Sequence, residues 1–358
     1  MPRIIAHLDM DAFFAAIEER DTPAFRGVPL VVGADPRGGQ GRGVAATSNY
    51  LARAYGIQSA TPISRAWQAS EAARRAGKPP VTFVSVDMPK YLRVSDAVLT
   101  IVRRHIPIVE QASIDEAYGD LSHTGSYEAA ETLCRTLKGA IRAEQQLTAS
   151  IGIGPNKLVA KIASGLHKPD GLTVVREEEA EAFMEPLPVR AIPGIGPKSE
   201  DILRDQGLRS VRDVKQRTIF QLVDLMGKRG AALYDHVRGL DRTPLEVSSR
   251  SKSIGEQTTF ASDTGESQAL VQQLTALTQG IVARLHEEGF QSFRTIVLTV
   301  RFADFETRSR AHTLAVSSAD QATLWREALR LLMPFLDRRE NPRGKLIRLL
   351  GLRVEKLK

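Results

Sequence analysis

Apolar residues in the first 155 positions follow two patterns, short runs typical of strands and the spacing typical of helices. Spacings of three and four predict amphipathic helices over residues 91–104 and 127–146, and short β-branched runs predict strands. In chain order with the first strand, these elements form β-α-β-β-α-β, the ferredoxin-like arrangement, whose first strand runs beside its third. The strands expected in it are residues 4–9, 106–111, 115–120 and 148–153.

A second group of elements is inserted after the first strand. The apolar pattern predicts helices over residues 12–20, 48–55 and 62–76 and a strand over residues 30–32. After a break at residues 76–80, the next region begins with a predicted strand over residues 81–86. A Gly-rich polar loop, residues 33–43, separates two of these elements. No Gly-Lys-Ser/Thr follows the loop, which excludes a Walker phosphate-binding motif and favours a plain hairpin loop.

The C-terminal half changes character twice. After a helix over residues 157–166, the stretch 186–239 is predicted to be all helical, with short elements. A polar linker is expected at residues 245–253. Beyond it, β-branched runs at 295–300 and 346–354 alternate with helices over 267–288 and 319–336, so a second α+β domain is predicted.

Length and charge agree with this division. A chain of 358 residues exceeds one ordinary core and should divide into two to four domains. The net charge is +7, and the segment from Arg250 onward holds 17 Lys or Arg against 12 Asp or Glu, which is five of those seven charges. A basic excess of this kind is typical of a domain that faces a polyanion such as DNA, although a solvated basic surface would have the same composition.

Several other classes of protein are disfavoured. The single cysteine, Cys134, excludes a disulfide framework and a cysteine-based zinc site. Asp9 and Asp11 interrupt the first apolar run, so it does not resemble a signal peptide, and no apolar stretch reaches membrane-spanning length. A cytoplasmic protein without membrane contact is therefore expected.

Carboxylates lie at the ends of two predicted strands. Asp115 and Glu116 stand between apolar neighbours, and Asp9 closes the first strand. Ionised carboxylates beside a core need a compensating cation or hydrogen bonds. If the first and third strands are neighbours, these oxygens converge into a site suited to Mg²⁺. The alternative is that Asp115 and Glu116 form a solvated hairpin tip. Asp11 is assigned to capping the following helix rather than to the site.

Five stretches, in order and at family-like spacing, resemble the Y-family DNA polymerases of the bacterial DinB or DNA polymerase IV type. They are residues 7–14 (HLDMDAFF), 47–53 (TSNYLAR), 113–118 (SIDEAY), 152–163 (GIGPNKLVAKIA) and 192–196 (IPGIG). The resemblance implies an α+β multidomain fold: a ferredoxin-like palm, fingers, a helical thumb with a helix-hairpin-helix, and a separate α+β little finger. The implied bounds are palm 1–11 and 78–168, fingers 12–77, thumb 169–244, linker 245–253 and little finger 254–358.

The resemblance also implies an activity and a metal. It predicts template-directed DNA synthesis by phosphoryl transfer from a dNTP to the primer 3′-hydroxyl, with low fidelity, translesion synthesis past damaged bases and no proofreading exonuclease. Two Mg²⁺ ions would stabilise the attacking and leaving oxygens, with Mn²⁺ as an ion able to take their place. The implied ligands are Asp9, Asp115 and Glu116, with the main-chain carbonyl of Met10.

The same motifs imply which residues contact the nucleotide. The implied dNTP-binding residues are Phe13, Phe14, Thr47, Tyr50, Arg53 and Lys161. Phe14 takes the place of the steric gate, whose ring leaves no room for a 2′-hydroxyl; a core aromatic is the alternative. Small residues around the nascent base pair imply an open pocket that tolerates damaged templates, although they would equally suit tight packing. These residues are Ala34, Val44, Ala46 and Ala60.

DNA contacts are expected in the second half. A helix-hairpin-helix turn at Gly194, Ile195, Gly196 and Lys198 would bind a DNA phosphate through main-chain N–H groups; a simple tight turn is the alternative. The expected partners are primer-template DNA and a dNTP, with the protein acting as a monomer. The chain ends at residues 354–358 without the Gln- and Leu/Phe-containing peptide by which family members dock on a sliding clamp, which leaves a clamp as partner open.

Two other functions share part of this pattern. Another palm-type nucleotidyltransferase or a cyclase would use the same carboxylates but has no need of a helix-hairpin-helix or a basic second domain. A catalytically inactive DNA-binding accessory protein would be expected to lack one of Asp9, Asp115 and Glu116, and all three are present.

Overall fold

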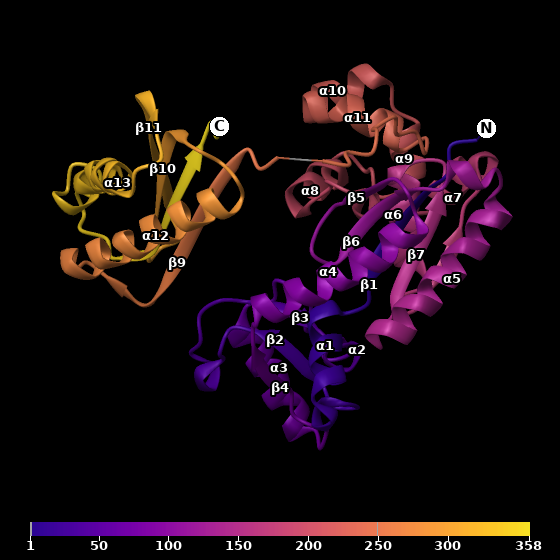
Figure 1. The fold of residues 1–358 in the computed structure, drawn as a ribbon, viewed down its shortest axis with the longest axis horizontal. Coiled ribbons are helices and arrows are strands. Elements are labelled where there is room, and N and C mark those ends of the chain that lie inside the picture. The colour runs from indigo at the N-terminus through magenta and orange to yellow at the C-terminus, as the bar shows by residue number, and fades with distance from the viewer. Residues whose placement is uncertain (1, 249) are drawn as a thin grey trace. The chain divides into compact units, whose positions relative to one another are not determined.

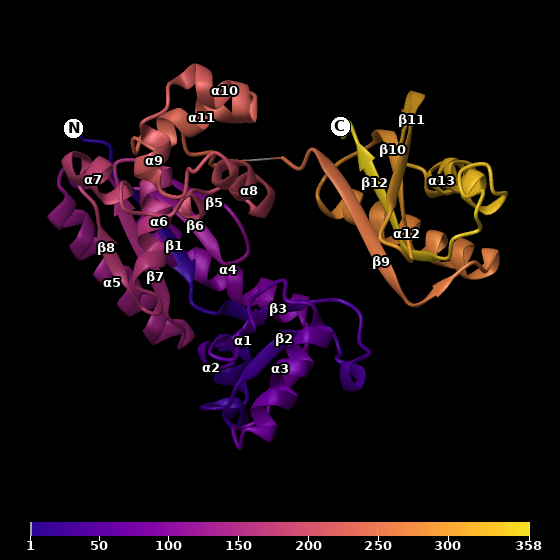
Figure 2. The ribbon, with the colours of Figure 1, turned by 180° about the vertical axis from the view of Figure 1, so that it is seen from behind.

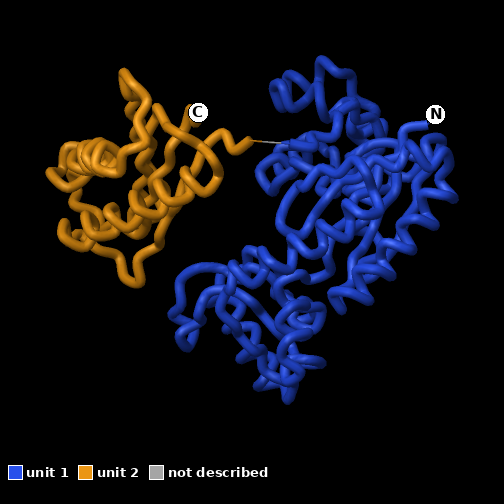
Figure 3. Tube along the Cα trace, viewed as in Figure 1, with its two compact units in different colours: residues 1–248 blue, residues 249–358 orange. Residues whose placement is uncertain are grey.

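A computed structural model of the chain describes residues 2–248 and 250–358. The chain divides into two units, Met1–Ser248 and Ser249–Lys358, coloured separately in Figure 3. Each unit has its own hydrophobic cores, so each is described by itself.

The first unit contains the predicted β-α-β-β-α-β arrangement. Its five-stranded sheet has the order β5-β6-β1-β7-β8, so the first strand does lie beside the third. Helices α4 and α5 pack together over one face, and α6 packs on β1 and β7 from the other (Figure 1). The elements are β1 (Ile5–Met10), α4 (Met88–His105), β5 (Val109–Gln111), β6 (Glu116–Asp120), α5 (Tyr127–Gln145), β7 (Ala149–Gly154), α6 (Lys157–Leu166) and β8 (Leu172–Val174).

Residues of β1 alternate between the two faces of this sheet. Ala6, Leu8 and Met10 lie in the core under α4 and α5. Ile5 packs with Ala160 of α6 on the opposite face, which by the period of two is also the face of Asp9. The Asp9 side chain, near the end of β1, is therefore directed away from the main core.

The predicted fingers contribute β2 and β3 (Figure 2) to a three-stranded sheet with the order β3-β2-β4. Strand β4, which runs parallel to β2, comes from within the bounds predicted for the palm. The helix expected over residues 48–55 is shorter than predicted. It spans four residues because Asn49 caps its start by accepting a hydrogen bond from the Ala52 N–H, and Gly56 (φ 79°) ends the turn that follows it. The elements are α1 (Phe13–Asp21), β2 (Leu30–Gly33), β3 (Ala45–Ser48), α2 (Tyr50–Arg53), α3 (Ile63–Arg75) and β4 (Thr82–Ser85).

The predicted thumb is built from short helices around a small core, as the pattern indicated. Its helices are α7 (Ala180–Met184), α8 (Pro197–Asp205), α9 (Val211–Lys215), α10 (Ile219–Met226) and α11 (Lys228–His236), with short 3₁₀ turns at Glu177–Glu179 and Val189–Ala191. The chain that follows the thumb contacts the palm. Leu245 packs against Ile5 and Tyr118, and the Glu246 N–H donates to Glu110 Oε2 at 2.8 Å, so the linker begins as a segment fixed to the palm.

The second unit is an antiparallel four-stranded sheet of order β11-β10-β12-β9, with α12 and α13 packed on one face. Sequence analysis found two of its four strands. Strands β9 and β11 were missed because polar residues occupy most of their positions, leaving little apolar alternation. The elements are β9 (Ser253–Thr264), α12 (Ser267–Glu287), β10 (Phe293–Phe302), β11 (Thr307–Ser318), α13 (Gln321–Leu336) and β12 (Ile347–Glu355).

Candidate active site

Two of the predicted carboxylates lie directly opposite each other in the sheet. Strands β1 and β6 pair antiparallel with Asp9 in register with Glu116, so both side chains share the face toward α6. Asp115 precedes the first residue of β6, where the backbone turns, and its carbonyl accepts the N–H of Met10 at 3.0 Å. The structure thus brings together the four residues that sequence analysis named as metal ligands.

Each of the paired carboxylates is met by a lysine. The ammonium of Lys161, from α6, lies 2.7 Å from Glu116 Oε2, and that of Lys168 contacts Asp9 Oδ1. His7 Nε2 lies 3.8 Å from the same oxygen of Glu116. The nearby His7 and the hydrogen bond from Lys161 lower the pKa of Glu116 to about 2. Burial has the opposite effect on Asp9: it raises the pKa to about 6 despite the neighbouring Lys168.

These oxygens are the kind of donor that binds a divalent cation, although the described residues do not form a complete set of metal ligands. Across residues 2–248 and 250–358, no three side chains of His, Cys, Asp or Glu are grouped so that they could hold a metal ion. In this arrangement Lys161 and Lys168 neutralise Glu116 and Asp9. Carboxylate and carbonyl oxygens are nevertheless the donors that hard cations prefer, and a buried carboxylate such as Asp9 requires a positive charge beside it.

The two phenylalanines of α1 have different surroundings. Phe13 is 2% exposed and belongs to the main core, so its ring cannot contact a nucleotide. Phe14 is only partly buried and stacks on Tyr91, with ring centroids 4.2 Å apart and an interplanar angle of 13°. The Tyr91 hydroxyl in turn donates to Glu18 Oε1 at 2.7 Å. Of the two rings, Phe14 is the more exposed.

The predicted triphosphate contacts lie on β3, α2 and α6. The guanidinium of Arg53 lies 4.6 Å above the centre of the Tyr50 ring and donates to the Ser48 carbonyl, so the pair is held as one unit. The Tyr50 hydroxyl points at Asp11 Oδ1 across 3.5 Å, and burial raises the pKa of Tyr50 to about 12. Thr47, next to them on β3, is half-buried.

Asp11 does not cap a helix, contrary to the sequence prediction. Helix α1 starts after Ala12, whose φ of 46° is left-handed, and no side chain caps it. Asp11 is 3% exposed and accepts hydrogen bonds from Ser150 Oγ (2.8 Å) and from the N–H of Asp170 (2.7 Å). The prediction was wrong because both partners come from distant parts of the chain.

The four small residues predicted to line the base-pair pocket are brought to one rim of the fingers sheet. The Ala34 N–H donates to the Val44 carbonyl at 3.2 Å, and the Ala60 N–H donates to the carbonyl of Ala45 at 2.8 Å. Val44 is 46% exposed, and Ala46 follows it on β3 by the two-residue period of a strand.

The predicted hairpin turn in the thumb has the geometry that its glycines suggest. Gly194 has a φ of +90°, with open space where a Cβ would stand. Gly196 precedes α8, which starts at Pro197, and Lys198 in its first turn is exposed. Sequence analysis missed a second turn, Gly227 between α10 and α11, with Lys228 and Arg229 exposed beside it; the Gly-Lys-Arg-Gly sequence was the available signal.

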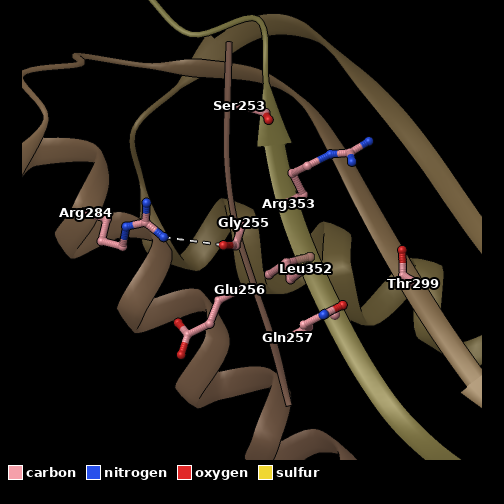
Figure 4. Close-up of a pocket in the computed structure, with 9 residues that line it drawn as sticks. Ser253, Gly255, Glu256, Gln257, Arg284, Thr299, Leu352 and Arg353 are labelled. Atoms are coloured by element: carbon pink, nitrogen blue, oxygen red, sulfur yellow. Dashed lines mark hydrogen bonds between the residues drawn. The ribbon is translucent and has the colours of Figure 1, made fainter. Parts of the chain in front are cut away.

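In the second unit, the sheet face opposite the helices is polar. Arg353 pairs with Gly255 and with Val297, while Thr299 pairs with Gly351, so the two polar side chains stand on that face. Figure 4 shows Arg353 and Thr299 on one side of the strands and Arg284 of α12 on the other, where it donates to the Gly255 carbonyl. The glycines leave room beside the polar side chains, which line a hollow in the surface.

Comparison with known proteins decides the family. Residues 8–165 match the impB/mucB/samB family, residues 251–358 match the C-terminal domain of the same family, and residues 190–241 match the thumb domain described as DNA polymerase-iota, thumb domain. DNA polymerase IV of Methanoculleus marisnigri is 40% identical over 99% of this chain and 94% of the relative.

The chain belongs to the Y family of DNA polymerases, DNA polymerase IV type.

Further relatives agree. DNA polymerase IV of Streptococcus gordonii is 37% identical over 98% of this Y-family chain and 96% of the relative. Among solved structures, the Y-family DNA polymerase chimera Dbh-Dpo4(243-245)-Dbh is 28% identical and covers 99% of both chains with a TM-score of 0.85. The insertion ternary complex of Dbh DNA polymerase is 27% identical, with the same coverage and a TM-score of 0.68.

Membership of the Y family confirms the predicted class of fold and of activity. The protein is a DNA-directed DNA polymerase, a nucleotidyltransferase that copies a template and performs translesion synthesis, and it depends on a divalent metal. Among the described residues, no helix is both long enough and apolar enough to pass through a lipid bilayer.

Proposed function

We propose that Asp9, Asp115 and Glu116, with the Met10 carbonyl, form the metal site at which this polymerase joins a dNTP to the primer 3′-hydroxyl. The observation that carries the proposal is the register of β1 and β6, which sets Asp9 opposite Glu116 with Asp115 one residue away. We propose Mg²⁺ as the ion, with Mn²⁺ as a substitute, because all the donors are oxygens. When bound, the ions would stabilise the attacking and leaving oxygens of the displacement.

Different residues of the palm and fingers would contact the triphosphate and the sugar of the nucleotide. Arg53 and Lys161 are cationic donors suited to triphosphate oxygens, and Thr47 and Tyr50 would add hydroxyl donors, with the Tyr50 ring lying against the Arg53 guanidinium. Phe14 would place its ring against C2′ of the sugar. For the buried Phe13, only a main-chain contact is left in the proposal.

The rim of small side chains supports an open pocket for the nascent base pair. With Ala34, Val44, Ala46 and Ala60 there, little side-chain bulk would check the shape of the pair. We propose that this rim underlies tolerance of damaged template bases.

The second half of the chain would hold the duplex. We propose that the turn at Gly194–Gly196 with Lys198 binds a backbone phosphate, and that the polar sheet face of the second unit adds attraction that is independent of base sequence. The proposed domains are palm 1–11 and 78–168, fingers 12–77, thumb 169–244, linker 245–253 and little finger 254–358. We propose that the protein acts as a monomer in the cytoplasm; a sliding clamp stays open as a partner.

Primer extension tests the metal site. Wild-type protein with primer-template, dNTPs and Mg²⁺ is expected to extend the primer, whereas Glu116→Ala and Asp9→Asn are expected to lose extension but still bind DNA. Omitting Mg²⁺ from the wild type should have the same effect as either substitution. Extension that survives both substitutions would overturn the assignment. Turnover of nucleotide without DNA would support a cyclase-like enzyme, and DNA binding without any extension would support an accessory protein.

A further inference from the structure

Lys168 touches an active-site carboxylate but belongs to none of the motifs that identified the site. It lies in residues 167–171, the loop between α6 and β8, and its ammonium contacts Asp9 Oδ1. The side chains of Lys168 and Asp9 are 22% and 18% exposed, so most of the contact is shielded from water. An ion pair of this kind is stronger than one on the open surface.

The loop that carries Lys168 is held from the palm sheet by buried groups. Asp11 Oδ2 accepts the N–H of Asp170 at 2.7 Å, and Ser150 Oγ accepts the N–H of Gly171 at 3.1 Å. The Ser150 hydroxyl donates to Asp11 Oδ1 at 2.8 Å, so the two anchors are themselves joined. Both side chains are almost fully buried.

Helix α5 holds the same loop from its other side. The ammonium of Lys138 donates to the Gly171 carbonyl at 2.8 Å and contacts Asp170, and Arg142 pairs with the Asp170 carboxylate. Gly171 also fits too tightly for any side chain, because a Cβ there would stand 2.4 Å from the His167 carbonyl. With its backbone held at so many points, the loop presents Lys168 to Asp9 in a defined position.

We propose that the Lys168 ammonium competes with a divalent metal ion for the Asp9 carboxylate. Lys168 neutralises Asp9 in the free enzyme, and the metal ion binds Asp9 fully only when the Lys168 ammonium moves away. Asp11 is the positioning residue that holds the Lys168 loop in place. This inference rests on the proposed metal site. The physical reason is that a buried carboxylate needs a counter-charge at all times, whereas Asp9 Oδ1 cannot bind an ammonium and a metal ion in the same place.

Mn²⁺ titration of the full chain without DNA or nucleotide, followed by the EPR signal of free Mn²⁺, tests the competition. Lys168→Met is expected to tighten Mn²⁺ binding roughly 5- to 150-fold, the span of typical coupling free energies. The matched control is Lys78→Met, which removes one positive charge at an exposed lysine far along the chain, and it should bind as the wild type does. Equal or weaker binding by Lys168→Met than by Lys78→Met would overturn the inference while leaving the metal site intact.

Two further variants separate the parts of the proposal. Asp9→Asn should abolish or greatly weaken the Mn²⁺ signal change; if it binds like the wild type, the proposed metal site fails and this inference fails with it. Asp11→Asn should tighten Mn²⁺ binding in the wild-type background but not in the Lys168→Met background, because the loop then carries no competing charge. An equal effect in both backgrounds would contradict the positioning role of Asp11.

Lysine labelling gives a second test that uses the wild-type protein and therefore requires no substitution. Acetylation by an N-hydroxysuccinimide ester, read by mass spectrometry at each lysine, should be slow at Lys168 and should accelerate when Mg²⁺ or Mn²⁺ is added. Lys78 should react at one rate throughout. Labelling of Lys168 that is insensitive to saturating Mn²⁺ would overturn the proposal.

Discussion

The ring of Phe14 lies nearly parallel to the ring of Tyr91, 4.2 Å from it and inclined by 13°. Tyr91 is fully buried and its hydroxyl is held by Glu18, so the stack fixes one face of Phe14, and the proposal places the other face against the sugar of the nucleotide. A ring supported in this way cannot swing aside to admit a larger sugar.

Replacing Phe14 by Ala is therefore expected to raise ribonucleotide insertion while DNA synthesis continues. A steric clash of about 1–3 kcal/mol corresponds to roughly 5- to 150-fold in discrimination, which is the expected loss. Single-nucleotide insertion kinetics with matched dNTP and rNTP measure it. Phe13→Leu is the control, because Phe13 is a core residue: it should affect stability and leave sugar selection unchanged. Unaltered discrimination in Phe14→Ala would remove Phe14 from the role.

Lys90→Met is expected to destabilise the first unit by about 2 kcal/mol, since a hydrogen-bonded charge is lost from a buried site. Glu18 is 5% exposed and is compensated by the Lys90 ammonium at 2.6 Å and the Tyr91 hydroxyl. Urea unfolding followed by circular dichroism measures the change. The double variant Lys90→Met with Glu18→Gln should recover part of the loss, because no buried charge then lacks a partner. A double variant no more stable than Lys90→Met would contradict this account.

Two glycine-to-alanine substitutions should change the free energy of unfolding in opposite directions. At Gly230, a Cβ would stand 2.0 Å from the Leu222 carbonyl, so α10 and α11 would have to separate, at a cost of about 1–3 kcal/mol. At Gly139, on the exposed side of α5, nothing lies within 4 Å, and Ala should stabilise the helix by about 0.5–1 kcal/mol. Thermal unfolding of both variants gives the comparison. A neutral Gly230→Ala would mean that the two helices are not held this close.

Lys198→Ala is expected to weaken binding to duplex DNA equally for all sequences. Loss of one phosphate contact should reduce the slope of log affinity against log salt by about 1. Fluorescence anisotropy over a series of salt concentrations measures it. Lys78→Ala is the comparison, since it removes the same charge outside the proposed DNA surface. An equal change of slope in both variants would show that Lys198 acts only through net charge.

The ferredoxin-like order of strands and helices was predictable because each element carries its own period of apolar residues. The apolar run in residues 4–9 and the amphipathic spacing in residues 91–104 need no information from the rest of the chain, and both elements are present. The polar strands β9 and β11 were not predictable in this way, because they are held in the sheet by main-chain pairing with neighbours whose positions the local pattern does not encode.

The sequence by itself determined which carboxylates end the strands and which family they resemble, since these depend on residue types in local order. Only the tertiary structure decided the surroundings of those carboxylates. Asp9 meets Lys168 and Asp11 meets Ser150 and Asp170 across more than a hundred residues of chain. Such pairings depend on how the sheet and the loop after α6 pack together, and burial then sets the strength of each charge interaction, which no local pattern reports.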